Sequence, residues 1–256
     1  MAMKVMIFAA GLGTRLKPLT DTMPKAMVPV NGKPLLQILL ERLQRAGADK
    51  VVINVHHFAQ QIKDFVAQHK FAGVDVAISD ESDQLLETGG GIKKALPLFN
   101  NGNDEPILIH NVDILHNVDL HRFYSEASEM CRQKEMGAML MVSNRSTSRY
   151  LLFDNDNRLV GWTNISTGEV KSPYKNLDVS KCKMYAFSGI HIITPALAPF
   201  FDEWQGKFAI IDFYLSVCNR IAIYANVNEN LHLIDVGKLD TLAKAEDFLK
   251  QQEAEV

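Results

Sequence analysis

Cysteine is scarce in this sequence, and the placement of the few cysteines excludes their common structural uses. Cys131, Cys182 and Cys218 lie far apart, and no pair of them has CxxC spacing. This pattern argues against a disulfide framework and against a zinc site. It is typical of proteins in a reducing compartment, so we expect the chain to be cytoplasmic.

Long apolar runs and runs of positive charge are missing as well. No stretch approaches the roughly 18 consecutive apolar residues that indicate a membrane span. Both signs of charge are spread along the chain, the net charge is −3, and no basic run of the nucleic-acid-binding kind occurs. We therefore expect neither a membrane nor a nucleic acid as a partner, and local groups must bind any anion. The oligomeric state remains open.

Apolar residues, by contrast, are abundant enough for a sizeable core, at 47% of 256 residues. Up to about residue 115, short apolar runs alternate with helical patterns, which predicts right-handed βαβ crossovers. The expected fold class is α/β, with a Rossmann-like, mostly parallel sheet flanked by helices, and with ligands beyond the carboxyl ends of the strands. The expected strands are 5–10, 51–55, 74–78 and 106–110, and the helices are expected to follow Pro34, to run through 62–66 and to begin near Gly89.

The pattern changes after about residue 137, where short strands alternate with polar turns. We predict a smaller antiparallel lobe that is inserted in the chain, laid over the sheet and used for substrate specificity. The whole chain is then one domain, in which 1–136 bind the main ligand, 137–230 form mainly this lobe, and 231–256 add a closing strand and helix. The strands expected in the lobe are 139–143, 151–153, 159–162 and 185–193.

A glycine loop directly follows the first expected strand. Gly11 and Gly13 allow positive φ and let the backbone approach a ligand closely. Several N–H groups, including that of Thr14, can then converge on one anion. The loop is not a Walker A loop, which requires GxxxxGK[ST]. It is not a Rossmann fingerprint either, because Leu16 stands where the third glycine would be.

Two cations follow these glycines, and with them the resemblance to a known family becomes specific. Arg15 supplies a planar guanidinium that matches phosphate oxygens, and Lys25 follows the rigid Pro24. The run GLGTRLKPLTDTMPKAMVPVNGKPLL resembles the G-x-G-T-R, P-L-T and P-K signature of the sugar-1-phosphate nucleotidyltransferases. The run LETGGGI at 86–92 is similar to the branch that contains N-acetylmuramate-1-phosphate uridylyltransferase, with mannose- and heptose-1-phosphate guanylyltransferases as near relatives.

The resemblance implies a reaction, a metal and its ligands. The enzyme would transfer a nucleotidyl group from UTP or GTP to a sugar 1-phosphate and release pyrophosphate with the help of Mg²⁺. The metal-binding aspartates of the family match Asp113, in Asn111-Val112-Asp113, and Asp235, in Ile-Asp-Val-Gly. The family has glycine where Val112 stands, and a β-branched residue resists positive φ. Either the turn differs here, or the family glycine is not needed for its φ.

The resemblance also assigns catalytic roles to the first loop. Arg15 would hold the leaving pyrophosphate, together with the amides of the segment from Gly11 through Gly13 to Thr14. Lys25 would stabilise charge at the α-phosphate. Positioning and charge stabilisation are nearly all that such a phosphoryl transfer requires. No general base is needed, because the attacking phosphate is already ionised.

Recognition of the base and the sugar is less sharply defined. Glu81, Gly89 and Gly90 are expected to contact the nucleotide, and Thr88 is expected to cap the helix that follows. Glu81 could accept from guanine, whereas Gln84 could pair with uracil, so the base stays open.

For the sugar phosphate, the expected contacts are Asn111, Arg149 and Gly189. The family often has a Glu-Lys-Pro motif in the second lobe, and the nearest match is Lys171-Ser172-Pro173. The sequence does not identify the sugar.

Two other functions compete with this prediction. A metal-dependent glycosyltransferase would use an Asp-x-Asp turn, which Asp154-Asn155-Asp156 matches, but it would leave Arg15 and Lys25 without a role. A non-catalytic nucleotide-sugar sensor is suggested only by Val112. The histidines, including His110 and His116, are expected to be structural, because Mg²⁺ prefers oxygen ligands.

Overall fold

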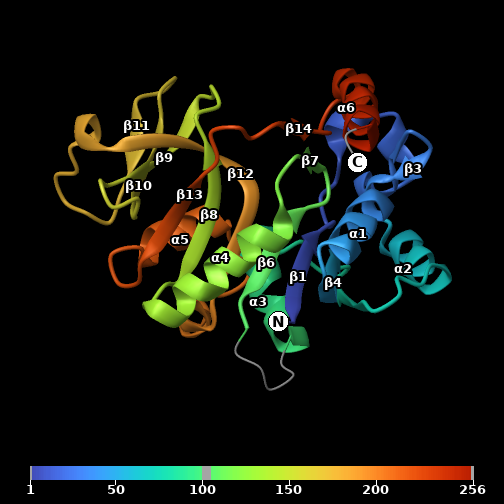
Figure 1. Cartoon of the computed structure of the whole chain (residues 1–256), viewed down its shortest axis with the longest axis horizontal. Coiled ribbons are helices and arrows are strands. Elements are labelled where there is room, and N and C mark those ends of the chain that lie inside the picture. Colours follow the sequence, from blue (N-terminus) through green and yellow to red (C-terminus); the bar gives the residue numbers. More distant parts are fainter. Residues whose placement is uncertain (1, 100–104, 255–256) are drawn as a thin grey trace.

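The computed structural model describes residues 2–99 and 105–254. Its first half has the alternation of strands and helices that the sequence predicts (Figure 1). The strands pair in parallel in the order β6-β1-β4-β5. The elements of this half are β1 (Met3–Phe8), α1 (Leu35–Arg45), β4 (Ala48–Val55), α2 (Ala59–Gln68), β5 (Asp75–Asp80), α3 (Glu87–Ala95) and β6 (Ile107–Asn111), with a small hairpin of β2 (Pro29–Val30) and β3 (Lys33–Pro34) before α1.

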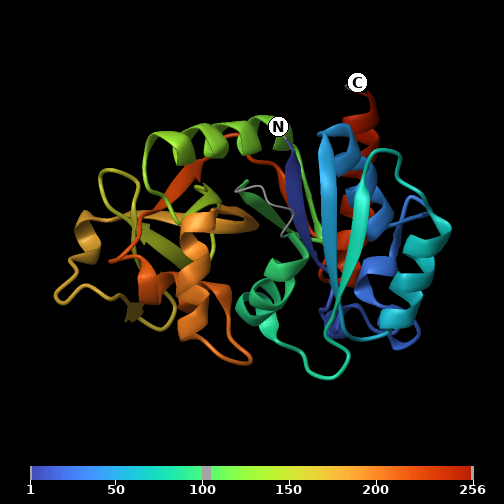
Figure 2. The same cartoon turned by 90° about the horizontal axis from the view of Figure 1, so that it is seen from below.

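Alternating side chains of the central strand bury into two separate cores. Val5 and Ile7 pack in a cluster with the apolar face of α1, whereas Met6 packs with Ile92 of α3. Because successive side chains of a strand point to opposite faces, one strand can serve both layers. Figure 2 shows α1 and α2 on one side of β1 and β4, and α3 on the other. The predicted sheet with helices on both faces is confirmed.

The second half does not lie over this sheet but extends it. Strand β12 (Lys183–Ile193) runs antiparallel to β6, so that both halves share a continuous ten-stranded sheet. We call the part of the chain from 137 to 230 the distal lobe. Its other strands are β8 (Ala138–Ser143), β9 (Arg149–Phe153), β10 (Leu159–Asn164), β11 (Glu169–Lys171) and β13 (Ile223–Val227).

The distal lobe is mostly, but not wholly, antiparallel. Strands β9, β10 and β11 form antiparallel pairs, and β12 joins them through Lys183 to Tyr185. Strand β13, however, runs parallel to β8. The smaller antiparallel sheet that the sequence predicts is therefore present, and the one parallel strand of the lobe, β13, lies beside β8.

Several helices were not predicted from the sequence. Helix α4 (Leu120–Gln133) begins after Asp119, whose side chain accepts from the backbone N–H of Arg122. Such a cap supplies one of the hydrogen bonds that the first turn of a helix lacks. Helix α5 (Ile210–Val217) and a 3₁₀ segment at Pro195–Glu203 pack in the same core as α3.

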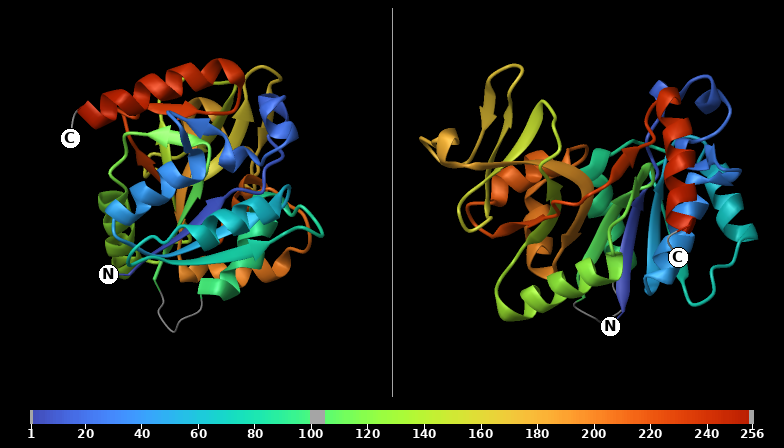
Figure 3. Two further views of the ribbon diagram at one scale, coloured as in Figure 1. Left: turned by 90° about the vertical axis from the view of Figure 1, so that its right-hand side faces the viewer. Right: turned by 45° about the horizontal axis from the view of Figure 1, so that its top comes forward.

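The end of the chain returns to the first half. Strand β14 (Leu233–Asp235) pairs antiparallel with β7 (Ile114–His116), and helix α6 (Leu242–Ala254) follows. Figure 3 shows α6, in red, beside the first half of the chain. Gln252 of α6 donates to the carbonyl of His116, and Arg42 of α1 donates to Gln252. None of the helices in the described part of the chain combines the length and the apolarity that a membrane crossing requires.

Candidate active site

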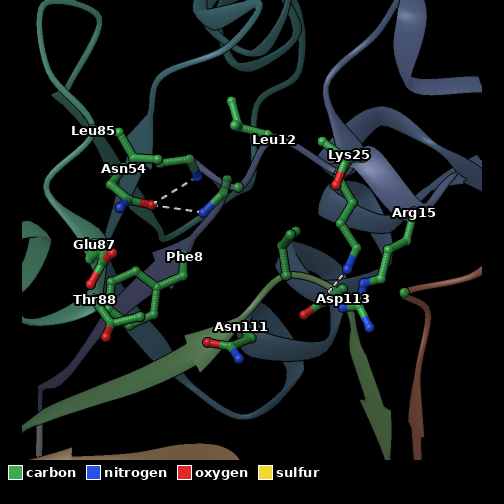
Figure 4. Close-up of a pocket in the computed structure, with 17 residues that line it drawn as sticks. Phe8, Leu12, Arg15, Lys25, Asn54, Leu85, Glu87, Thr88, Asn111 and Asp113 are labelled. Atoms are coloured by element: carbon green, nitrogen blue, oxygen red, sulfur yellow. Dashed lines mark hydrogen bonds and ion pairs between the residues drawn. The ribbon is translucent and has the colours of Figure 1, made fainter. Parts of the chain in front are cut away.

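A cavity of about 540 Å³ lies at the carboxyl ends of the parallel strands, where ligands of such sheets bind. Figure 4 shows two ends of this cavity. At one end, Arg15 and Lys25 face Asp113, and at the other lie Phe8, Leu85 and Thr88.

The glycine loop leads from β1 into the cavity. Gly13 has φ +65, and a Cβ there would lie 2.9 Å from Cγ2 of Thr20, so both its conformation and its surroundings require glycine. Gly11 lines the cavity, and a Cβ there would meet nothing within 4 Å. The loop residues Gly11, Gly13, Thr14 and Arg15 all line the cavity, as the sequence predicts.

Asn54, at the end of β4, braces this loop and was not predicted. Its Oδ1 accepts from the backbone N–H groups of Ala9 at 2.7 Å and Ala10 at 3.3 Å. The side chain is buried, and its Nδ2 donates to Oε1 of Glu81 at 2.8 Å. An amide inside the apolar run 51–55 was the available signal, because a buried amide in a strand requires partners.

Glu81 lies behind the cavity rather than in its wall. The residue is fully buried, and its carboxylate accepts from Asn54 and, at 3.1 Å, from the backbone N–H of Leu86. It therefore holds Asn54 and the segment before α3 in place. The structure thus places this expected base reader outside the cavity lining, where it supports Asn54 and, through Asn54, the glycine loop.

Lys25 and Asp113 meet at one end of the cavity, and Asp235 lies close to the same lysine. The Lys25 ammonium forms an ion pair with Oδ2 of Asp113, and its Nζ lies 3.9 Å from Oδ1 of Asp235. Lys25 is largely buried, whereas the Asp235 side chain is half exposed. Residues that are 88 positions apart or more thus meet at one point, as the family resemblance implied for Asp113 and Asp235.

A short antiparallel ladder fixes the spacing of the two carboxylates. Asp235 of β14 lies opposite Ile114 of β7, and the N–H of Val236 donates to the carbonyl of Asp113 at 2.8 Å. Burial raises the pKa of Asp235, and the neighbouring charge of Asp113 raises it further. Lys25, Arg15 and Arg145 act in the opposite direction. At Asp235, burial and the charge of Asp113 therefore outweigh the cationic neighbours.

These two carboxylates fit a hard divalent cation. They converge on a single ammonium group, and neither is tied into a helix cap. Among the described residues, no group of three or more His, Cys, Asp or Glu side chains is arranged to hold a metal. Mg²⁺ is commonly held by one or two carboxylates together with phosphate oxygens and waters, so two are sufficient.

Val112 is accommodated without strain in the turn that carries Asp113. Its φ is not positive, its side chain is buried, and its N–H donates to the carbonyl of Phe8 at 3.1 Å. A β-branched residue is tolerated in such a conformation. The turn therefore does not need the φ that only glycine adopts readily.

Gly89 and Gly90 lie beneath the cavity wall and pack against the distal lobe. The N–H of Gly89 donates to the carbonyl of Phe208 at 2.9 Å, and a Cβ on Gly89 would lie 2.3 Å from the Phe208 ring. They do not line the cavity, although Glu87 and Thr88 do. The prediction that Thr88 caps α3 is wrong: its Oγ1 accepts from the N–H of Ile210 instead. The glycines serve close contact between loop 206–208 and α3.

The expected sugar contacts lie in two different places. Asn111, at the end of β6, lines the cavity. Gly189 of β12 has φ +81, and a Cβ there would lie 2.8 Å from Nδ2 of Asn111. Arg149, at the start of β9, is exposed and is not part of the cavity lining.

His110 and His116 form a buried chain that ends at Asn111. The N–H of Val118 donates to Nδ1 of His116, so Nε2–H of His116 donates to Nε2 of His110 at 2.8 Å. His110 can then donate from Nδ1 to the carbonyl of Asn111 at 2.7 Å. Burial lowers the pKa of His110 to about 4, which keeps the imidazole neutral. Both histidines are structural in the sense expected from the sequence.

The turn that a glycosyltransferase would need is occupied by its own hydrogen bonds. Oδ1 of Asp154 accepts from the N–H groups of Asp156 and Arg158. None of these residues lines the cavity with Arg15 and Lys25. The structure therefore favours a polar β-turn here over a metal site.

Comparisons with known proteins agree with this geometry. The chain is 32% identical over 215 residues to N-acetylmuramate alpha-1-phosphate uridylyltransferase of Caulobacter vibrioides, covering 82% of this chain and 81% of the relative. It is 33% identical over 129 residues to D-glycero-alpha-D-manno-heptose 1-phosphate guanylyltransferase of Campylobacter jejuni, covering 50% and 56% of the two chains. A solved structure of UDP-glucose pyrophosphorylase complexed with UDP-glucose matches with a TM-score of 0.75 at 18% identity, covering 98% of this chain and 100% of that one, and so has the same fold.

A family model provides the assignment. The model described as "Nucleotidyl transferase" matches residues 4–252, which include the glycine loop, both cations and both aspartates. The resemblance seen in the first loop is thereby confirmed along nearly the whole chain. The protein belongs to the nucleotidyl transferase family.

Proposed function

We propose that the protein transfers a nucleotidyl group from UTP or GTP to a sugar 1-phosphate, giving a nucleotide sugar and pyrophosphate. Lys25 and Asp113 line one cavity with the glycine loop and Arg15, and Asp235 lies 3.9 Å from the Lys25 ammonium; this convergence is the observation that carries the proposal. The relatives that act on N-acetylmuramate 1-phosphate and heptose 1-phosphate support the substrate class. We further propose that the reaction takes place in the cytoplasm.

The reaction is an in-line displacement at the α-phosphorus. An oxygen of the sugar phosphate forms the new bond to phosphorus, and the bond between the α-phosphorus and its bridging oxygen to the β-phosphate breaks. The electron pair leaves with pyrophosphate. The attacking oxygen is already ionised, so the protein does not have to remove a proton, and its task is to position and neutralise charge.

The cations of the first half suit the triphosphate. Arg15 and the loop residues Gly11, Gly13 and Thr14 all line the cavity, so they are available to bind the β- and γ-phosphates. Lys25, which contacts Asp113, is close enough to the carboxylates to serve the α-phosphate. Mg²⁺ held by Asp113 and Asp235 would supply neutralisation of phosphate oxygens at the reacting centre.

The rest of the cavity suits the other parts of the substrates. Phe8, Leu85 and Thr88 form the end opposite the phosphate site, and their apolar surfaces suit a nucleobase. Asn111 lies between this end and Asp113, next to Gly189 of the distal lobe. The sugar phosphate would therefore approach from the side of β12.

Pyrophosphate release tests this function directly. The chain is incubated with each of the four ribonucleoside triphosphates and a panel that includes N-acetylmuramate, glucose, mannose and heptose 1-phosphates. Release that requires one particular nucleotide–sugar pair, and Mg²⁺, supports the proposal. Nucleotide-sugar consumption without pyrophosphate would indicate a glycosyltransferase. Binding of nucleotide without turnover of any pair would indicate a sensor and would contradict catalysis.

A further inference from the structure

The distal lobe supplies a cation that the sequence motifs did not reveal. Arg145 lies in the loop between β8 and β9, and its N–H donates to Oγ of Ser143 at 3.4 Å. Nη2 of its guanidinium donates to the carbonyl of Phe187 at 3.3 Å. Arg145 therefore lies over the middle of β12, the strand of the distal lobe that pairs with β6 of the first half.

This part of β12 is the part that approaches the candidate active site. The register between β12 and β8 shifts between Phe187 and His191, and Gly189 adopts φ +81 within the shift. The irregular segment brings Gly189 against Asn111, whose side chain lines the cavity beside Asp113. Phe187, whose carbonyl accepts from Arg145, is thus only two residues from Gly189, which lies against Asn111 of the first half. Such irregularities commonly re-aim strands near functional sites.

Four other cations of the distal lobe are already paired with carboxylates, whereas Arg149, Arg158, Lys175 and Lys183 form no ion pair among the described residues. Lys171, the lysine of the Lys-Ser-Pro match, lies 3.3 Å from Asp212 and over the ring of Trp162. Three others form ion pairs with carboxylates elsewhere, namely Lys181 with Asp178, Lys207 with Glu87, and Arg220 with Glu203. Arg145 takes part in none of the ion pairs found among residues 2–99 and 105–254.

A guanidinium that forms no ion pair with a carboxylate suits a phosphate dianion. It has five N–H donors, and here the hydrogen bond of the side chain is to the single carbonyl of Phe187. The remaining donors can form a bidentate pair with phosphate oxygens, which is stronger and more directional than a contact from lysine. The triphosphate and the sugar phosphate bring about six negative charges into the cavity. Lys25 and Arg15 are needed for the triphosphate, so the second anion needs a cation of its own.

We propose that Arg145 binds the phosphate group of the sugar 1-phosphate from the distal side and positions it for attack, next to Asn111 and Gly189. This inference rests on the proposed function, because it assigns the acceptor anion of that reaction. It moves the role that the sequence suggested for Arg149 to a residue four positions earlier in the chain. It also separates the two anions between two halves of the protein.

The test compares matched arginine variants in the full-length enzyme. Arg145→Gln is expected to raise KM for the sugar 1-phosphate about 10- to 100-fold, the effect of losing a charged hydrogen bond, and to leave KM for the nucleotide unchanged. Arg145→Lys keeps the charge without the planar fork, so a smaller increase is expected. Arg149→Gln is the control: like Arg145, this side chain is exposed and lies outside the cavity lining, but none of the hydrogen bonds found among the described residues joins it to β12, and the variant should behave as the wild type.

The outcomes distinguish this proposal from the function on which it depends. If the wild type turns over no nucleotide–sugar pair, the proposed function fails and Arg145 loses its assigned role with it. If the wild type is active and Arg145→Gln keeps its KM for the sugar 1-phosphate, only the assignment of Arg145 is overturned. An effect of equal size in Arg149→Gln would also overturn it. Nucleotide binding by calorimetry, unchanged in Arg145→Gln, shows that a KM effect does not come from misfolding.

Discussion

The ammonium group of Lys25 forms an ion pair with Asp113, a residue 88 positions later in the chain. The same nitrogen lies 3.9 Å from Asp235, so one cation of the protein occupies the point on which both carboxylates converge. A divalent cation that binds both aspartates would have to compete with Lys25 until a phosphate draws the lysine away. Nucleotide and metal should therefore bind together more readily than either alone.

Lys25→Gln should separate the two effects of this lysine. Turnover should fall about a hundredfold or more, since loss of one preorganised donor at the reacting centre costs on the order of 3 kcal/mol. Binding of Mn²⁺ in the absence of nucleotide should become tighter, because a competing positive charge is removed. Steady-state kinetics measure the turnover, and titration with Mn²⁺ followed by electron paramagnetic resonance measures the affinity for the metal. Lys17→Gln, whose exposed partner is Asp21, is the control. Weaker Mn²⁺ binding in Lys25→Gln would contradict the prediction.

Asp235→Asn should lose activity and gain stability. The pKa of Asp235 is raised in the folded protein by burial and by Asp113, so folding disfavours its ionised form. At neutral pH, without added divalent cations, the neutral amide removes this cost, and Tm should rise. Nucleotidyl transfer in Mg²⁺ should become too slow to detect or fall by more than a hundredfold, the order expected for one lost electrostatic contact. Calorimetry and pyrophosphate release measure the two properties. Asp240→Asn, in the turn before α6, should change neither.

The parts of the fold that depend on local patterns were predictable. The apolar runs at 5–10 and 51–55 predicted the parallel strands, and the glycines, Arg15 and Lys25 were predicted to share one site and do line one cavity. Local patterns suffice there because a strand buried on both faces and the loop at its carboxyl end are both encoded by residues that are adjacent in the sequence.

The parts that depend on distant contacts were not predictable. Glu81 is polar and follows a strand, as a ligand-binding residue would, yet its partners Asn54 and Leu86 bury it completely. Gly89 resembles a ligand-contacting glycine, but the ring of Phe208, more than a hundred residues later, occupies the space beside it. Arg145 belongs to no motif, and its place is determined by the irregular part of β12. In each case the partner is selected by tertiary packing.

Gly189→Ala should affect the sugar side of the active site beyond the cost of its backbone conformation. Gly189 and Gly168 have φ of +81 and +73, so alanine at either position should cost about 1–2 kcal/mol of stability. Only at Gly189 would the added methyl group meet a neighbour, Nδ2 of Asn111 at 2.8 Å. Gly189→Ala should therefore also raise KM for the sugar 1-phosphate, whereas Gly168→Ala should keep the wild-type KM. Equal kinetics in the two variants would show that Asn111 does not have to keep its position.

A buried histidine in the distal lobe should make stability depend on pH. His191 is hydrogen bonded to the Tyr214 hydroxyl at 2.6 Å, and burial lowers the pKa of its imidazole to about 3. The unfolded chain binds a proton at this residue below about pH 6.5, whereas the folded chain binds it only near pH 3. Stability should therefore be fully present above pH 6.5 and should fall as the pH drops toward 3, by about 1.4 kcal/mol per pH unit for this residue. His191→Gln cannot titrate, so its free energy of unfolding by urea, measured from pH 7.5 to 4.5, should fall less steeply by about that slope. If the free energies of unfolding of variant and wild type fell with the same slope, His191 would bind a proton as readily in the folded protein as in the unfolded chain. The lobe would then have to open around His191 and Tyr214 to hydrate the charge.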